Sequence, residues 1–168
     1  GTDGKEKMSK SLGNCIYLSD DAKTVEQKVK SMYTDPTHLN VSDPGHVEGN
    51  AVFTYLDAFA TNQDFADFCP KFKTLDELKD AYTQGGIGDM KCKKMLMKVI
   101  NRMLDPIRAR RHEYEQDIPV IFNILRRGSD AAREAAAQTM DEVRNAMRIN
   151  YFDDERLIKE QSEKYREK

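Results

Sequence analysis

Lys7-Met8-Ser9-Lys10-Ser11 is the stretch on which the interpretation of this chain depends. It holds two lysines three positions apart and two hydroxyl side chains, with glycines on both sides. A lysine ammonium is compact and offers three hydrogen-bond donors, and glycine lets a backbone move or approach a ligand closely. The stretch therefore predicts a mobile, cationic loop that closes over ATP and stabilises the charge developing on departing pyrophosphate.

A bare Lys-x-x-Lys pattern is also typical of a solvated basic segment, so the flanks of the loop matter. Gly1-Thr2-Asp3-Gly4-Lys5-Glu6 precedes it and Leu12-Gly13-Asn14 follows it. With these flanks, the run resembles the second signature of the class I aminoacyl-tRNA synthetases. It is most similar to that of the tryptophanyl-tRNA synthetases of the bacterial type.

The resemblance continues downstream and covers roughly residues 1 to 149. The segments that carry it are Met32-Tyr33-Thr34-Asp35-Pro36, Pro44-Gly45-His46-Val47-Glu48-Gly49-Asn50, Val52-Phe53-Thr54-Tyr55-Leu56-Asp57, Gly85-Gly86-Ile87-Gly88-Asp89 and Pro106-Ile107-Arg108-Ala109-Arg110-Arg111. The sister family of tyrosine enzymes is the alternative, but its loop usually departs from Met-Ser in the middle. The intact Met8-Ser9 favours the tryptophan enzymes.

The resemblance implies a ligase that activates tryptophan with ATP, accompanied by Mg²⁺, and then charges tRNA(Trp). It implies that Lys7 and Lys10 are the catalytic residues and that Lys10 contacts the leaving phosphates more directly. The expected ATP-binding residues are Lys7, Met8, Ser9, Lys10 and Ser11. The two serines would fix the closed form of the loop and Met8 would be an apolar peg, while no metal ligands are evident in the sequence.

In this family the nucleotide-binding fold, with a His-Ile-Gly-His-type signature and the tryptophan pocket, lies ahead of the lysine loop. The chain is therefore expected to be a C-terminal portion that is inactive alone. Residues 1–19 would hold the loop and the end of the catalytic domain, and residues 20–149 a helical domain resembling an anticodon-binding domain. Residues 150–168 would be an extension without an assigned function. The complete enzyme is expected to be a homodimer.

A different class of function stays open beside this one. The chain could be a non-catalytic helical module that binds tRNA or another RNA, or a protein partner, and merely retains the loop. A coding region upstream that holds the missing signature would favour the enzyme.

The composition fits a helical protein of one domain, or a domain with an appendage. The chain has 168 residues, of which 39% are hydrophobic and 33% charged. No apolar run approaches the ~20 residues needed to span a bilayer, and no signal peptide is recognisable. Cys15, Cys69 and Cys92 are odd in number and far from a CxxC pattern, so reduced thiols and a cytoplasmic location are expected. No histidine has metal-ligand spacing with these cysteines.

Positive charge is concentrated in one part of the sequence. The stretch from Lys91 to Arg127 holds ten Lys/Arg against four Asp/Glu, a net charge of +6 in a chain whose total is −2. Clustered cations of this kind are the expected footprint of an RNA contact, although a charged helix face is more often simply solvated. The stripe from Lys91 to Arg111 is the best candidate for contact with phosphates.

The hydrophobic pattern predicts a mainly α fold, a helical bundle that follows the loop and a short extended segment. Cys15-Ile16-Tyr17-Leu18 is the extended segment, either an edge strand or the last piece of an α/β nucleotide-binding domain, and is interpreted as a hinge. Thr24 with Gln27 forms a capping box that opens a helix. Pro36, Pro44 and Gly45 make residues 34–49 a loop.

Apolar periodicity predicts the next helix from Val52 to Phe59. The aromatic residues around Pro70 are expected to pack a bend against it. Thr74 with Glu77 forms a second capping box. Gly85-Gly86-Ile87-Gly88 then makes a turn between two helices rather than a phosphate loop, since it is not G-x-G-x-x-G and follows no strand.

The longest apolar stripe runs from Cys92 to Leu104, with Asp89 as the expected N-cap. Pro106 is expected to stop or kink this helix near Asp105. Asp117 should cap a further helix that Gly128 closes. Ser129 should cap another, with small and apolar residues repeating from Ala132 to Met147, and residues 150–168 form a docked terminal helix or a frayed tail.

Overall fold

The computed structural model describes residues 1–152 and 154–166 of the chain, and these residues form seven α-helices and no strand. The mainly α fold predicted from the sequence is therefore confirmed, whereas the edge strand considered at Cys15–Leu18 is wrong. The chain separates into two compact units, Gly1–Glu113 and Tyr114–Lys168. These units divide the chain differently from the expected ranges 1–19, 20–149 and 150–168, which stay a prediction.

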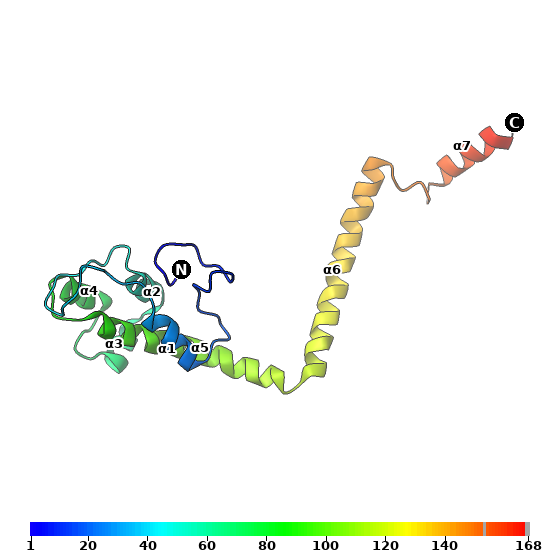
Figure 1. Cartoon of the computed structure of the whole chain (residues 1–168). Helices are drawn as coiled ribbons and strands as arrows, with labels where there is room; N and C mark the ends of the chain where they lie inside the picture. Colours follow the sequence, from blue (N-terminus) through cyan, green and yellow to red (C-terminus); the bar gives the residue numbers. More distant parts are fainter. Residues whose placement is uncertain (153, 167–168) are drawn as a thin grey trace. The chain divides into compact units, whose positions relative to one another are not determined.

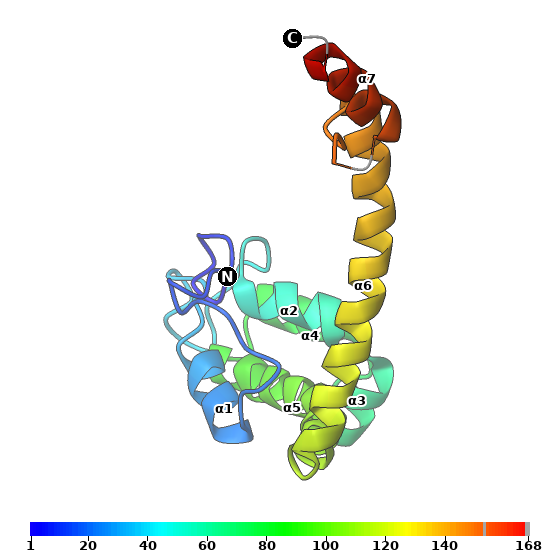
Figure 2. The ribbon, with the colours of Figure 1, turned by 90° about the vertical axis from the view of Figure 1, so that its right-hand side faces the viewer.

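In the first unit, four short helices gather around the first turns of a long one (Figures 1 and 2). The short helices are α1 (Ala22–Lys30), α2 (Ala51–Phe59), α3 (Asn62–Phe68) and α4 (Leu75–Thr83), and the long one is α5 (Asp89–Glu115). Each contributes apolar side chains to one core. The most deeply buried of these are Val25, Val29, Val52, Phe53, Leu56, Phe65, Leu78, Tyr82, Leu96, Val99, Ile100 and Leu104.

The start of α1 differs from the prediction by a few residues. Asp21 is the N-cap, and its carboxylate accepts a hydrogen bond of 2.7 Å from the backbone N–H of Thr24. Thr24 therefore lies inside the helix rather than at its start. Both residues are good N-caps, and Asp21 supplies the acceptor because the helix begins earlier, at Ala22.

Two other caps belong to α3 and α4. The bend expected around Pro70 contains the short helix α3, which a full capping box between Thr61 and Asp64 opens. At α4 the predicted cap is half correct. Thr74 accepts a hydrogen bond from the backbone N–H of Glu77, but the carboxylate of Glu77 accepts from the backbone N–H of Lys73 instead of Thr74.

The first residue of α5 is Asp89, and its carboxylate does not cap the helix as predicted. It accepts a hydrogen bond of 2.7 Å from the hydroxyl of Tyr82 and lies 3.4 Å from Nδ1 of the buried His38. Of the stop or kink expected near Asp105, the stop is wrong, since α5 continues through Pro106 to Glu115. Proline removes one backbone bond, and the turns on both sides remain helical.

The second unit contains α6 (Ile118–Met147) and α7 (Glu155–Arg166). Asp117 caps α6 as predicted, because its carboxylate accepts from the backbone N–H of Val120 at 3.2 Å. The predicted stop at Gly128 and restart at Ser129 are wrong, since both residues lie inside one continuous helix of 30 residues. The helix ends at Arg148, which adopts the left-handed conformation at φ 55°.

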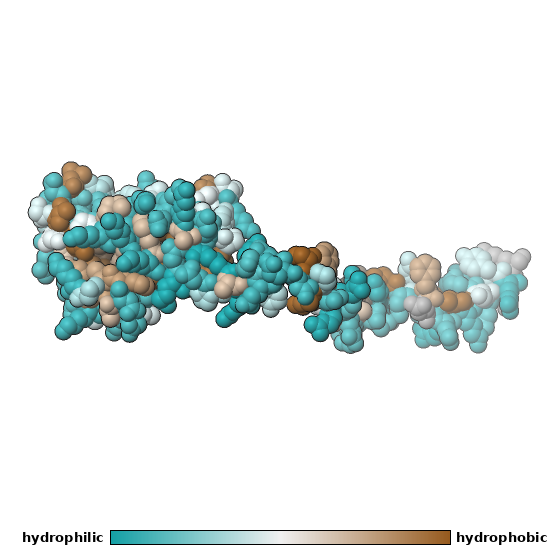
Figure 3. Space-filling view, turned by 90° about the horizontal axis from the view of Figure 1, so that it is seen from below, coloured by the Kyte–Doolittle hydropathy of each residue, from teal (hydrophilic) through white to brown (hydrophobic). Residues whose placement is uncertain are grey.

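Hydrophobic side chains remain uncovered in the second unit. Neither α6 nor the described part of α7 has a buried residue, and hydrophobic patches are visible among the hydrophilic side chains of this unit (Figure 3). Phe122, Leu125 and Met147 are 68%, 59% and 64% exposed. Within the described residues, no helix combines the length and the apolar character that crossing a membrane requires.

Candidate functional site

The five residues predicted to bind phosphate lie together on an irregular loop of the first unit. Lys7 and Lys10 are both exposed, and their ammonium groups have no hydrogen bond or ion pair within the described part of the chain. The hydroxyls of Ser9 and Ser11 lie 2.8 Å apart. A turn follows, in which the N–H of Gly13 donates to the carbonyl of Lys10 at 3.3 Å. The loop thus presents two uncompensated cations to solvent.

The side chain of Asn14 forms hydrogen bonds that hold the loop in place. Its oxygen accepts from the backbone N–H of Ser9 at 2.8 Å, and its nitrogen donates to the carboxylate of Asp3 at 3.0 Å and to the carbonyl of Lys7 at 3.3 Å. Asn14 is only 5% exposed. A single buried amide therefore connects the segment before the lysines with the backbone between them.

Backbone hydrogen bonds attach the same loop to the body of the first unit. The N–H of Thr2 donates to the carbonyl of Asn14 at 2.8 Å, and the carbonyl of Thr2 accepts from Tyr33 at 3.0 Å. Tyr33 follows the end of α1. The base of the loop is consequently fixed, while the two lysine side chains stay exposed.

Met8 lines an apolar cavity of about 310 Å³. The hydroxyl of Tyr55, on α2, donates to the sulfur of Met8 at 3.4 Å. The cavity is lined by Met8, Ile16, Leu18, Thr54, Tyr55, Ala58, Phe59, Ile100, Met103 and Leu104. Burial raises the pKa of the Tyr55 hydroxyl, so it stays a protonated donor. Ile16 and Leu18, which belong to the segment predicted to be a hinge, thus form part of the cavity wall.

Hydrogen bonds stabilise the ionised carboxyl group of Asp3 next to the loop. The side-chain hydrogen bond from Asn14 lowers the pKa of the Asp3 carboxyl, with further donors in the backbone N–H groups of Lys5 and Glu6. A carboxylate whose charged form accepts several hydrogen bonds stays ionised at neutral pH. Asp3 is therefore occupied with the loop backbone and leaves both lysines free for an external anion.

Comparison with known proteins identifies the family. The model of the class I tRNA synthetases for tryptophan and tyrosine (W and Y) matches residues 1–105. This chain belongs to that family. The tryptophan–tRNA ligase of Clostridium longisporum is 54% identical over 152 residues, which are 90% of this chain and 42% of that protein. The tryptophan–tRNA ligase of a Streptococcus pyogenes serotype M3 strain is 53% identical over 152 residues, or 90% of this chain and 43% of that protein.

A solved structure gives the same result for the fold. The tryptophanyl-tRNA synthetase of Campylobacter jejuni, complexed with ADP and tryptophan, aligns with a TM-score of 0.68 and 27% identity, over 88% of this chain and 42% of that one. The predicted resemblance to the tryptophan enzymes is therefore confirmed. The chain spans about two fifths of the length of these relatives.

The class I synthetases work on ATP with Mg²⁺, an ion that takes oxygen ligands. The described residues contain no group of three His, Cys, Asp or Glu side chains that could hold a metal ion. The carboxylate of Asp3, beside the loop, already accepts hydrogen bonds from Asn14 and from the backbone N–H groups of Lys5 and Glu6. The exposed, unpaired side chains of the loop, those of Lys7 and Lys10, are cations and therefore suit an anion.

The second predicted feature is the basic stripe on α5. In the structure it contains fewer exposed, unpaired cations than the sequence predicts. Lys93 is buried and donates to the carbonyls of Lys30 and Met32 at 2.8 and 2.7 Å. Arg102 forms an ion pair with the buried Asp64, and Arg108 donates to Asp105 at 2.8 Å. The cations that stay exposed along the first turns of α5 are Lys91, Lys94 and Lys98.

The sequence alone assigns no role to several residues of this candidate site. In the sequence, Asp3 and Asn14 are only flanks of the loop, and Tyr55 is only part of a segment that resembles the tryptophan enzymes. Asp35 and His46 also belonged to two separate similar segments, and the structure brings them together. The Nδ1 atom of His46 lies 2.7 Å from the Asp35 carboxylate.

Proposed function

We propose that this chain supplies the ATP-phosphate loop of a tryptophan–tRNA ligase. The observation that carries the proposal is the pair of exposed, unpaired ammonium groups on Lys7 and Lys10, on a loop whose backbone Asn14 fixes. The family match over residues 1–105 supports it. The activity is proposed for a protein of the relatives' full length, and we propose that the isolated chain does not catalyse it.

In the proposed reaction, a carboxylate oxygen of tryptophan attacks the α-phosphorus of ATP. The bond from that phosphorus to the bridging oxygen breaks, and pyrophosphate leaves with the electron pair. Negative charge grows on the departing group, and an ammonium group that approaches it stabilises the transition state more than the ground state. Lys10 would contact the leaving phosphates, and Lys7 would add a second cation. The tryptophanyl adenylate would then pass its aminoacyl group to a hydroxyl of tRNA(Trp), and AMP would leave.

The neighbouring residues would support the closed form of the loop. Ser9 and Ser11 would form hydrogen bonds from their hydroxyls to phosphate oxygens or to one another, and the 2.8 Å between the two hydroxyl oxygens supports this role. Met8 would fill the apolar cavity that it lines together with Tyr55. Mg²⁺ would arrive bound to ATP and neutralise phosphate charge, since the described side chains offer it no ligand set.

The proposal is tested in a chimera in which this chain replaces the matching segment of the Clostridium longisporum enzyme. Lys10→Ala is expected to slow tryptophan-dependent exchange of pyrophosphate into ATP by about 100-fold, the typical effect of losing one donor to developing charge. The affinity for tryptophan should change little. Lys23→Ala, which removes an exposed lysine on α1, is the control. Equal losses in rate and tryptophan affinity would contradict the transition-state role.

We propose further that the helical part of the chain binds tRNA(Trp). Lys91, Lys94 and Lys98 support this, because exposed cations on one helix face release counterions from a phosphate backbone. A gel-shift titration with tRNA(Trp) should give an affinity that falls steeply with salt. Absent or salt-insensitive binding would argue against tRNA. Binding without any contribution of Lys10 to catalysis in the chimera would favour the alternative of a non-catalytic RNA-binding module.

A further inference from the structure

A small cavity of about 220 Å³ lies between the end of α3 and the first turns of α5. Its lining residues are Phe68, Cys69, Lys91, Lys94, Met95 and Lys98. The walls thus combine an aromatic ring, two sulfur-containing side chains and three lysines. This cavity has no role in the proposed ATP chemistry, since none of its residues belongs to the loop.

The three lysines share one face of α5, because their spacing of three and four residues places successive side chains one turn apart. All three are exposed, and none forms an ion pair within the described residues. The ammonium group of Lys98 lies over the Phe68 ring, 5.4 Å from its centre, so that a base stacking on this face would take its place while the lysine moves to a phosphate. One turn further on, Arg102 has its charge balanced by Asp64. The cavity therefore marks the part of the α5 stripe where positive charge is not compensated.

An aromatic ring next to ammonium groups without an ion pair suits a ligand that contains both a planar ring system and anionic groups. An unstacked base of single-stranded RNA has this combination, because its ring stacks on an aromatic side chain and its phosphates meet the lysines. Pockets for larger ligands usually measure about 300–1,000 Å³. The smaller cavity here suits one ring system, with the sugar and phosphates outside.

We infer that the cavity between α3 and α5 receives a single unstacked base of the bound RNA, stacked on Phe68, with its flanking phosphates on Lys91, Lys94 and Lys98. This inference rests on the proposed tRNA-binding function and assigns it a location. The base is held by its ring face and its phosphates, so the contact tolerates different bases, as stacking sites do.

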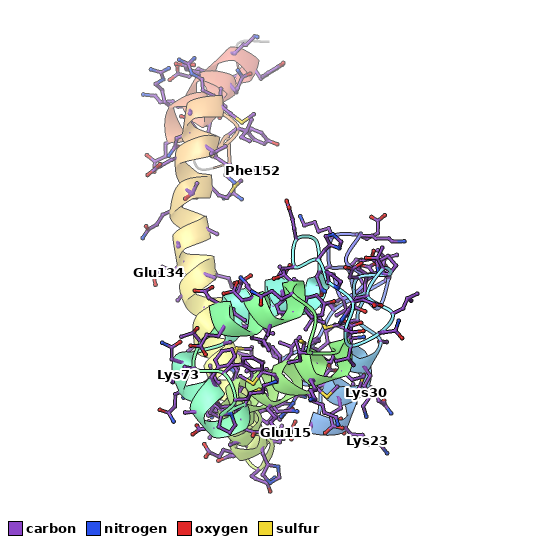
Figure 4. The ribbon with its side chains drawn as sticks, turned by 90° about the vertical axis from the view of Figure 1, so that its left-hand side faces the viewer. Lys23, Lys30, Lys73, Glu115, Glu134 and Phe152 are labelled. Atoms are coloured by element: carbon purple, nitrogen blue, oxygen red, sulfur yellow. The ribbon has the colours of Figure 1, made fainter. Side chains whose placement is uncertain are left out.

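Binding of a tRNA(Trp) transcript, followed by fluorescence anisotropy, tests the inference. Lys94→Gln and Lys98→Gln should each weaken binding several-fold and make its salt dependence less steep, by about 0.7 per lost phosphate contact. Lys23→Gln is the matched control, because Lys23 lies on α1 (Figure 4) and outside the cavity. Equal affinity of the wild type and both cavity variants would overturn the inference.

Phe68→Ala should weaken binding about tenfold, as expected for the loss of one base-stacking side chain. Since Phe68 also packs against the core, Phe68→Leu is measured beside it, because leucine retains an apolar side chain but no ring to stack on. A short oligouridylate and the same oligomer without bases provide a second comparison. The wild type should prefer the oligomer with bases, and equal affinity for the two would show that only phosphates are bound.

Cys69 reports on the cavity directly. It is partly exposed, whereas Cys15 and Cys92 are buried, so it should be the thiol that iodoacetamide modifies first. Bound tRNA should slow this modification several-fold. An unchanged rate in a complex that Lys94→Gln does not weaken would overturn the inference while leaving tRNA binding intact. If the wild type binds no tRNA at all, both the proposed tRNA-binding function and the inference about the cavity are wrong.

Discussion

The side-chain oxygen of Asn14 accepts a hydrogen bond of 2.8 Å from the backbone N–H of Ser9, at the centre of the lysine loop. The same side chain donates to Asp3 and to the carbonyl of Lys7. A residue outside the five-residue run therefore determines the backbone conformation of the run. Asn14 is a positioning residue in the proposed site, since it touches the loop and its two lysines remain free.

Asn14→Asp should loosen the loop without changing the size of the side chain. Aspartate still accepts from Ser9, but it cannot donate to Asp3 and instead places a second carboxylate against it. The substitution loses the hydrogen bonds to Asp3 and to the carbonyl of Lys7, of about 1 kcal/mol each, so the amide of Ser9 should exchange with solvent about 30-fold faster. Hydrogen exchange followed by NMR measures this. Asn62→Asp, at an exposed position of α3, should leave the Ser9 rate unchanged.

The contact between Asp35 and His46 predicts a dependence of stability on pH. The Asp35 carboxylate accepts from the hydroxyl and N–H of Thr37 at 2.6 and 2.8 Å, and from the N–H and Nδ1 of His46 at 2.7 Å each. These bonds, led by that of the Thr37 hydroxyl, lower the pKa of Asp35 well below its ordinary value. The unfolded chain has a carboxyl pKa near ~3.9. The stabilisation is therefore complete above about pH 4 and lost as the pH falls toward the lower folded value.

Asp35→Asn should consequently be less stable than the wild type at pH 6, and the difference should shrink by pH 3. Urea denaturation at both pH values measures it. Asp76→Asn, at an exposed position in the first turn of α4, serves as the control. A difference that is equally large at pH 3 and pH 6 would mean that the charge of Asp35 does not stabilise the fold.

The loop was recognisable from the sequence because its chemistry lies in five consecutive residues. The role of Asn14 was not, since residues 3, 7 and 9 meet it only after the chain has turned at Gly13. Likewise, the positive stripe on α5 was visible as a charge count, but the count included Lys93, which the fold buries. Spacing alone places Lys91 and Lys94 on one face; it does not show which neighbouring lysine faces the core.

Helix starts were predicted less well, because several residues near each start can provide the same hydrogen bond. Asp21 and Thr24 are equivalent by residue type, and only the position of the core face of α1 selects Asp21. The capping box of α3 was present in the sequence as Thr61-x-x-Asp64, yet the aromatic cluster around Pro70 favoured a bend. Local patterns of comparable strength compete, and tertiary packing decides between them.

Lys93 provides a test of how the fold uses a buried charge. Its ammonium group donates to the carbonyls of Lys30 and Met32, at and just beyond the end of α1, and burial lowers its pKa. Lys93→Met preserves the apolar stem but leaves both carbonyls without this donor, so the free energy of unfolding should fall by about 1–3 kcal/mol. Chemical denaturation measures it. Lys94→Met, at the exposed neighbour, should change it by less than about 0.5 kcal/mol.

Gly128 shows why a helix breaker in a sequence need not end a helix. Glycine inside a helix costs about 1 kcal/mol relative to alanine, which the alanine-rich turns that follow it in α6 can offset. A Cβ atom at Gly128 would meet no heavy atom within 4 Å. Gly128→Ala should therefore stabilise α6 by about 0.5–1 kcal/mol, seen as a higher midpoint in thermal melts followed by circular dichroism at 222 nm.

Gly49 is the matched control for this last substitution. A Cβ atom at Gly49 would also meet nothing within 4 Å, but its backbone has φ +71°, which alanine adopts only with strain. Gly49→Ala should destabilise the first unit by about 1–2 kcal/mol. The two sites have the same open surroundings. If Gly128→Ala raises the stability and Gly49→Ala lowers it, both effects are therefore due to the backbone conformation. Destabilisation by Gly128→Ala would show instead that α6 is not a continuous helix at that position in solution.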